Sequence, residues 1–146
     1  MFVDTILKAK GNAVVTAHPD TTVTEAAGIL TGKKIGLILV TDEDDGIVGI
    51  LSERDIVHAT ARHDGSVKGL AIRDIMTKSV LTCSPDDTLG DIMAMMTHRR
   101  VRHLPVLDDG GKLAGLISIG DVMKYRLEEI EHEEESMRQY ISGVGY

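Results

Sequence analysis

The stretch Gly49–Val57, with the sequence GILSERDIV, occurs a second time 66 positions later as Gly115–Met123, with the sequence GLISIGDVM. In both copies a glycine and branched apolar residues precede Ser-x-x-Asp, and another apolar run follows. This pattern predicts a buried strand that ends where a helix begins, with the serine and the aspartate at the junction. The same displacement, without a gap, pairs Val14 with Val80, Thr16 with Thr82, Pro19 with Pro85, Asp20 with Asp86, Thr22 with Thr88, Thr31 with Thr97, Val40 with Val106 and Asp42 with Asp108. One unit has therefore been duplicated.

Hydrophobic periodicity and turn residues predict an α+β protein in which each copy runs strand, helix, strand, strand, helix. In the first copy the ranges are 14–16, 23–32, 37–40, 47–51 and 55–61. In the second copy they are 80–82, 89–97, 103–107, 113–117 and a helix from about 119 to about 141. Thr21 or Thr22 can cap the first helix, and Gly32 can end it.

The predicted organisation is a lead-in at 1–13 that ends in the turn signal Gly11-Asn12, a first repeat at 14–61, a linker at 62–73, a second repeat at 74–126 and a helical extension with a tail at 127–146. The linker is rich in glycine and charge. In the last helix the apolar residues alternate spacings of four and three and are interrupted by Glu134; they are Met123, Leu127, Ile130, Met137 and Ile141. This stripe fits packing on the protein's own domain as well as a dimer or partner interface.

Composition excludes several classes of function. The chain has 146 residues, 27% charged and 42% apolar, which is typical of a globular protein. A net charge of −7 argues against a nucleic-acid partner. No signal peptide and no apolar run long enough for a membrane span are expected, so the prediction is a soluble, cytoplasmic protein without membrane insertion.

Nothing in the sequence supports catalysis or metal binding. Cys83 is the single cysteine, so an internal disulfide or a multi-cysteine metal site cannot form. The six histidines lack metal-ligand spacing, and no phosphate-binding glycine motif is present. We therefore expect a protein that is not an enzyme and requires no metal.

These residues resemble paired cystathionine β-synthase (CBS) domains, the tandem known as a Bateman module, from about Leu7 to Tyr125. The resemblance rests on the doubled Gly-x-x-Ser-x-x-Asp stretch, on SPDDTL at 84–89 echoed by HPDTTV at 18–23, and on RHLPV at 102–106, of which the first copy keeps GLILV at 36–40. It implies two small α+β subdomains with pseudo-twofold symmetry. It also implies clefts between the copies for adenine nucleotides or adenosyl compounds, regulation of a partner protein, and a homodimer formed through the CBS helices.

The resemblance implies one stronger nucleotide site. Asp55 would accept the two ribose hydroxyls and Ser52 would bind phosphate beside a helix N-terminus, with Arg102 and His103 as further phosphate ligands. The full set is Ile50, Ser52, Asp55, Ser79, Leu81, Thr82, Arg100, Arg102 and His103. Ser-x-x-Asp before an apolar run is also a helix capping box, and one residue can do both.

A weaker site is implied around the second aspartate, with the set Val14, Thr16, Lys34, Gly36, Arg54, Leu116, Ser118 and Asp121. Uncharged Gly36 and Leu37 stand where the other copy has Arg102 and His103, so phosphate would depend on Lys34 or Arg54. AMP or ATP is the expected ligand, with NAD, NADH or S-adenosylmethionine as alternatives. A rival interpretation is a ligand-free interaction module that acts through the acidic C-terminal helix.

Overall fold

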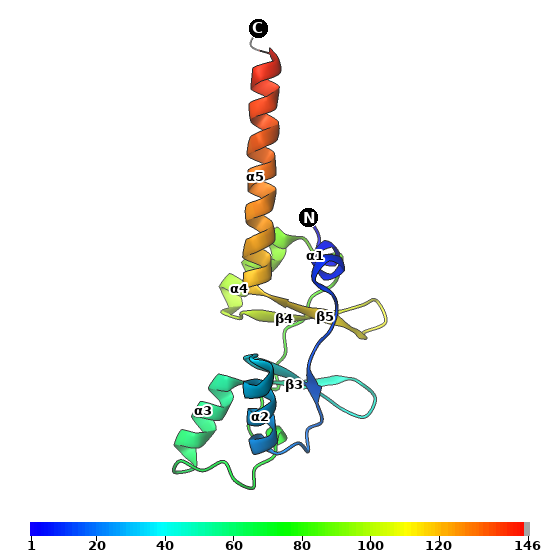
Figure 1. Ribbon diagram of the computed structural model, residues 1–146. Helices are drawn as coiled ribbons and strands as arrows, with labels where there is room; N and C mark the ends of the chain where they lie inside the picture. The colour runs from blue at the N-terminus through cyan, green and yellow to red at the C-terminus, as the bar shows by residue number, and fades with distance from the viewer. Residues whose placement is uncertain (145–146) are drawn as a thin grey trace. The chain divides into compact units, whose positions relative to one another are not determined.

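The computed structural model of the chain describes residues 1–144, so residues 145–146 of the predicted tail lie outside the described part. Its elements form two compact units (Figure 1). The first-repeat unit contains residues 13–81 and 111–113, and the second-repeat unit contains residues 1–12, 82–110 and the chain from 114 onward. The lead-in thus packs with the second repeat, and the linker packs with the first.

The first-repeat unit is built on a three-stranded sheet. Strand β1 (Thr16–Ala17) pairs in parallel with β2 (Leu37–Thr41), and β2 pairs antiparallel with β3 (Ile47–Ser52). Helices α2 (Val23–Lys33) and α3 (Glu53–Arg62) and a short 3-10 turn, η1 (Ile72–Asp74), complete the unit. Its core consists of fully or nearly fully buried side chains at Val23, Ala26, Leu30, Ile38, Val40, Leu51 and Ile72.

The second-repeat unit repeats this plan on a two-stranded sheet of β4 (His103–Leu107) and β5 (Leu113–Ser118). Helices α1 (Val3–Lys10), α4 (Leu89–Arg99) and the long α5 (Ile119–Val144) belong to it. Cys83 forms a parallel bridge to Val106. This bridge is the displaced copy of the pairing between Ala17 and Val40, so the duplication extends to the register of the sheets.

Both glycines that open the decisive stretch are required by close packing on the strand. A Cβ atom at Gly49 would lie 2.6 Å from Met76 Sδ and 3.0 Å from the Thr77 carbonyl oxygen. A Cβ atom at Gly115 would lie 2.7 Å from Leu7 Cδ2. In each unit a segment that is distant along the chain therefore packs on the strand that carries the glycine: Met76 and Thr77 pack on β3, and Leu7 packs on β5.

The mixed α+β class and the order of elements predicted from the sequence are confirmed, and two local predictions are wrong. The lead-in, for which the sequence predicted no element, forms α1, because Val3, Ile6 and Leu7 bury one face of a short helix. Residues 80–82 form no strand; only the neighbouring Cys83 pairs, through backbone hydrogen bonds of 2.9 Å to Pro105 and Leu107.

The second wrong prediction concerns the end of α2. The helix continues past Gly32 to Lys33, and its C-cap residue Lys34 takes the left-handed conformation with φ 54°. The Lys34 N–H reaches the carbonyl groups of Leu30 and Thr31, so hydrogen bonding at the helix end outweighs the ordinary preference for glycine in this conformation. The cap at the other end of α2, Thr22, is confirmed: its hydroxyl accepts from the Glu25 N–H at 3.1 Å.

Candidate functional site

The strand–helix junction of the first repeat holds Ser52 and Asp55 in a complete capping box. The Ser52 N–H donates to Asp55 Oδ2 at 2.9 Å, and the Asp55 N–H donates to Ser52 Oγ at 3.2 Å. The structure therefore contains the capping arrangement that the sequence left as one of two interpretations. The cap uses one carboxylate oxygen, and the other, Oδ1, points to a different neighbour.

That neighbour is Thr77, whose hydroxyl lies 3.3 Å from Asp55 Oδ1. Thr77 also exchanges two backbone hydrogen bonds of 2.9 Å with Ile50, the last-but-two residue of β3. A hydroxyl rotates freely and both donates and accepts, so it can reorient when a second donor approaches the carboxylate. Asp55 thus combines a rigid position with an acceptor oxygen that is not committed to the helix.

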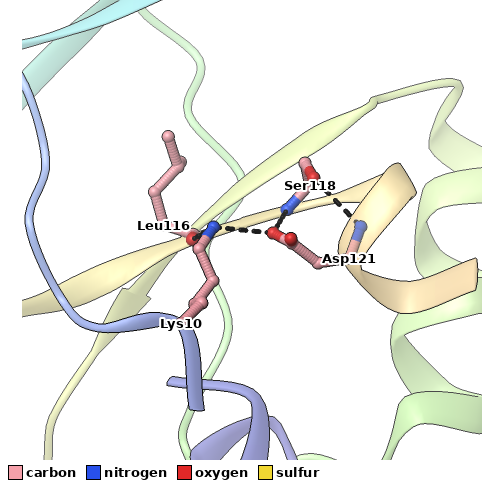
Figure 2. Close-up of polar contacts among 4 residues, drawn as sticks. All are labelled: Lys10, Leu116, Ser118 and Asp121. Atoms are coloured by element: carbon pink, nitrogen blue, oxygen red, sulfur yellow. Dashed lines mark hydrogen bonds and ion pairs between the residues drawn. The ribbon is translucent and has the colours of Figure 1, made fainter. Parts of the chain in front are cut away.

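The second repeat has the same box with different surroundings. The Ser118 N–H donates to Asp121 Oδ2 at 2.9 Å, and the Asp121 N–H donates to Ser118 Oγ at 3.1 Å. The ammonium group of Lys10 lies against the same carboxylate, 2.7 Å from Oδ2, and also donates to the Leu116 carbonyl oxygen at 3.0 Å (Figure 2). Asp121 therefore carries an ion pair in addition to its cap.

In the second-repeat unit Lys10 makes two hydrogen bonds that are equivalent to two hydrogen bonds of Thr77 in the first-repeat unit. The backbone N–H of Thr77 satisfies the Ile50 carbonyl group, and its hydroxyl contacts Asp55. The Lys10 ammonium satisfies the Leu116 carbonyl group, at the equivalent strand position, and pairs with Asp121. A cation has thus replaced a neutral hydroxyl, which makes the two aspartates electrostatically different.

The second junction perturbs two titratable groups. Burial alone would raise the pKa of Asp121, but hydrogen bonds from Lys10 and Ser118 outweigh it and hold the pKa below its ordinary value. Burial lowers the pKa of His103; the Asp121 charge opposes this shift, and Lys10 and Arg102 add to it. His103 is therefore within electrostatic reach of Asp121, in the same unit.

Residues of the two predicted sites belong to both units. Of the stronger set, Ile50, Ser52, Asp55, Ser79 and Leu81 lie in the first-repeat unit, and Thr82, Arg100, Arg102 and His103 lie in the second. Of the weaker set, Val14, Thr16, Lys34, Gly36 and Arg54 lie in the first-repeat unit, and Leu116, Ser118 and Asp121 lie in the second. Each predicted set therefore stays a prediction.

The backbone ties the predicted phosphate-binding strand to the helix N-terminus in the same way in both repeats. The Ile119 N–H donates to the Arg102 carbonyl oxygen at 2.8 Å, and the Glu53 N–H donates to the Gly36 carbonyl oxygen at 3.1 Å. Arg102 therefore lies beside the first turn of α5, next to Ser118. The first repeat presents Gly36 at this point and has no side chain there to supply charge.

Sequence reasoning missed a group of polar residues around α3. A small cavity of about 240 Å³ in the first-repeat unit is lined by Asp55, His58, Ala59, Arg62, His63, Asp74, Ile75 and Met76. The spacing of Asp55, His58 and Arg62 along one helix face was the available signal. The cavity is smaller than most sites for drug-sized ligands, but it gives the Asp55 carboxylate a polar, partly enclosed neighbourhood.

The thiol of Cys83 is buried in the second-repeat unit. Cys83 is 7% exposed, and burial, aided by the charge of Asp87, raises the pKa of its thiol to about 12, so the thiolate needed for nucleophilic chemistry does not form at neutral pH. Within residues 1–144 no group of three His, Cys, Asp or Glu side chains is placed to hold a metal ion. Among the helices of the described residues, none combines the length and apolar character that a membrane crossing needs.

Comparison with known proteins identifies the relatives of this arrangement. The CBS domain profile matches residues 11–62 and 72–128. The chain is 32% identical, over 149 aligned positions, to the mitochondrial CBS domain-containing protein CBSX3 of Arabidopsis thaliana, covering 97% of this chain and 71% of the relative. It is 29% identical to an uncharacterized protein of Methanopyrus kandleri, of which it spans 65% of the length.

Solved structures share the fold, and some of them contain adenosine-based ligands. A CBS-domain protein from Agrobacterium tumefaciens is 44% identical, with a TM-score of 0.81, over 86% of this chain and 99% of its own. The CBS pair of protein MJ0100, in complex with 5′-methylthioadenosine and S-adenosyl-L-methionine, is 27% identical (TM-score 0.76; 88% and 98% covered). Protein PAE2072 from Pyrobaculum aerophilum, in complex with AMP, is 26% identical (TM-score 0.72; 83% and 89% covered).

Proposed function

The chain belongs to the CBS-domain family, and we propose on this basis that it is a non-catalytic regulatory module that binds an adenosine-containing ligand through Asp55. AMP and ATP are the first candidates, and NAD, NADH and S-adenosylmethionine share the same adenosine part. Occupancy is signalled to a partner protein. A ligand can do this only insofar as it binds two conformations of the module with different affinity.

The observation that carries the proposal is that the two oxygens of the Asp55 carboxylate have different hydrogen-bond partners. Oδ2 is held by the Ser52 N–H of the cap, and Oδ1 meets only the rotatable hydroxyl of Thr77 among the contacts of the described residues. A ribose offers two adjacent hydroxyl donors, and a carboxylate has acceptor capacity for them beyond one cap bond. The positive end of the helix dipole beside Ser52 favours phosphate.

The relatives support an adenosyl ligand. The structural neighbour of 26% identity is in complex with AMP. The neighbour of 27% identity is in complex with 5′-methylthioadenosine and S-adenosyl-L-methionine. These ligands share adenosine and differ in what is attached at the 5′ position.

Thermal melting of the purified, ligand-stripped protein against each candidate tests the proposal. A ligand at 100 times its dissociation constant stabilises by about 2.7 kcal/mol, which raises the melting temperature by several degrees. Asp55→Asn keeps an amide oxygen to accept the cap bond from Ser52 but presents donors where a ribose needs an acceptor. The ligand-induced shift should vanish in this variant.

The matched control is Asp87→Asn, because Asp87 Oδ2 also accepts a backbone hydrogen bond, from Ser84 at 2.8 Å, outside the proposed site. This variant should keep the ligand-induced shift. Wild-type protein that melts at the same temperature with every candidate would contradict the proposed function. A shift that survives Asp55→Asn would contradict the role of Asp55.

A second candidate function is an interaction module without ligand that acts through α5. It is favoured by the exposed, acidic surface of α5. Every described side chain from residue 131 to residue 143 is exposed, and six of the eight residues from 128 to 135 are glutamates. This function is expected to leave the melting temperature unchanged in the nucleotide series. It does not depend on Asp55.

A further inference from the structure

Helix α5 carries an apolar stripe that the rest of its unit does not cover. Its members are 38% to 62% exposed: Met123, Leu127, Ile130, Met137 and Ile141. The CBS match ends at residue 128, so most of the stripe lies beyond the family's fold. In Figure 1 the C-terminal part of α5 runs away from strands β4 and β5 of its own unit.

The projecting part of α5 gains no stability from burying side chains on its own unit. An isolated helix shorter than about 12–15 residues is marginal in water, and most helix stability in proteins comes from packing an apolar face. From residue 131 onward no described side chain of α5 is buried.

The stripe has the heptad register of a two-stranded coiled coil. Leu127, Glu134 and Ile141 occupy a positions, and Met123, Ile130 and Met137 occupy d positions. The flanking e and g positions then decide which helix can pair with it. They are Lys124, Glu131 and Arg138 at e, and Arg126, Glu133 and Tyr140 at g.

These flanking charges are self-complementary in one orientation. In a parallel pair each g residue faces the e residue five positions later on the other helix. Arg126 then faces Glu131 of the second copy, and Glu133 faces Arg138. Both pairs join opposite charges, and each occurs twice because the arrangement is symmetric.

The opposite orientation places like charges together. In the antiparallel pair that matches the same core positions, g faces g and e faces e. Glu133 then faces its own copy, Glu131 faces its own copy, and Lys124 faces Arg138. Like charges in facing positions are destabilising, so the sequence favours the parallel pair.

We propose that α5 forms a parallel two-stranded coiled coil with α5 of a second copy of this chain, with the stripe from Met123 to Ile141 as its seam. Arg126 donates to Glu129 of its own helix at 2.9 Å, and its guanidinium has further donors for Glu131 of the second copy. Glu134 interrupts the apolar seam. A single polar a position lowers stability and fixes register and the number of helices.

Disulfide trapping tests the orientation. In a parallel pair, residue 137 of one helix meets residue 137 of the other in a single core layer, within the Cα separation of about 4.4–6.8 Å that a disulfide spans. Met137→Cys, in a Cys83→Ser background, should therefore form a covalent dimer under mild oxidation. Gln139→Cys, at an outward position, is the control and should remain monomeric on denaturing gels.

The alternative outcomes overturn specific parts of the proposal. Cross-linking of Leu127→Cys/Met137→Cys without cross-linking of Met137→Cys alone means an antiparallel pair. Equal cross-linking of Met137→Cys and Gln139→Cys means random collision. A dimer in sedimentation equilibrium that is unaffected by removal of residues 131–146 means that α5 is not the dimer interface.

Charge exchange tests the flanking pairs in the full chain. Arg126→Glu should weaken the dimer by about tenfold, because a carboxylate at position 126 of each copy then faces the carboxylate of Glu131. Adding Glu131→Arg to that variant should restore the wild-type affinity, and Glu128→Arg, at a solvated position, should not. Glu134→Leu should tighten the dimer; a looser dimer would contradict the assigned register.

Discussion

Lys10 donates from its ammonium group to Asp121 Oδ2 at 2.7 Å, although the two residues are 111 positions apart in the chain. The contact places a cation at a position where the first repeat has the hydroxyl of Thr77 beside Asp55. A ribose that approached Asp121 would compete with this ammonium for the carboxylate. We therefore expect the second junction to bind an uncharged adenosine ligand more weakly than the first.

Replacement of Lys10 should open the second junction. In an Asp55→Asn background, Lys10→Met is expected to raise the affinity for adenosine by up to about fivefold, since a partly exposed ion pair is worth at most about 1 kcal/mol. Isothermal titration calorimetry measures this change. Lys8→Met, which removes the exposed Lys8–Asp4 pair of the same helix, is the control and should have no effect.

Acid should destabilise the protein through Asp121. Because its pKa is lower in the folded state than in the unfolded state, the carboxylate contributes stability above its ordinary value of 3.8, and this stability is lost as the pH falls through the folded pKa. Urea unfolding between pH 6 and pH 3 should show a smaller loss in Lys10→Met than in the wild type. An identical loss in both would mean that Lys10 does not hold the carboxylate.

His103 should produce a second pH effect near neutrality. Its pKa is lowered in the folded state, so the unfolded chain binds the proton first, and the free energy of unfolding should fall as the pH falls below the ordinary value of 6.5. His103→Asn should reduce this fall. His132→Asn, on the exposed part of α5, is the comparison, and a fall of the same size in all three proteins would rule His103 out.

The two opening glycines should differ in their tolerance of a methyl group. Gly49→Ala would press on the Thr77 carbonyl oxygen at 3.0 Å, a backbone atom, whereas Gly115→Ala would press on the flexible end of Leu7. Overpacking costs about 1–3 kcal/mol, and Gly49→Ala should lie at the upper end.

Gly28→Ala provides the reference in the same urea-unfolding experiment. Gly28 lies in α2 with nothing within 4 Å of an added Cβ, so this change should stabilise the protein by about 0.5–1 kcal/mol. Equal effects of Gly49→Ala and Gly115→Ala would show that the backbone contact carries no extra cost.

Much of the fold could be predicted from the sequence because it depends on local pattern. All five predicted elements of the first repeat and four of the five in the second are present, with bounds within about three residues of the prediction, since alternating and helical periodicities and caps such as Thr22 act over a few residues. The exceptions lie where the local signal is weak. The segment at 80–82 has β-branched residues but pairs only at Cys83, and the lead-in forms α1 because another part of the chain covers its apolar face.

The sequence by itself determined the duplication, the α+β order and the two Ser-x-x-Asp junctions. These features depend on residues that are close together in the chain, such as the serine and aspartate of a capping box. Only the tertiary structure decided that α1 packs with the second repeat, that Leu7 and Met76 rest on Gly115 and Gly49, and that Lys10 neutralises Asp121. These contacts join segments that are distant along the chain. No local pattern specifies them, because they arise from the burial of apolar faces and the pairing of charges once the chain has folded.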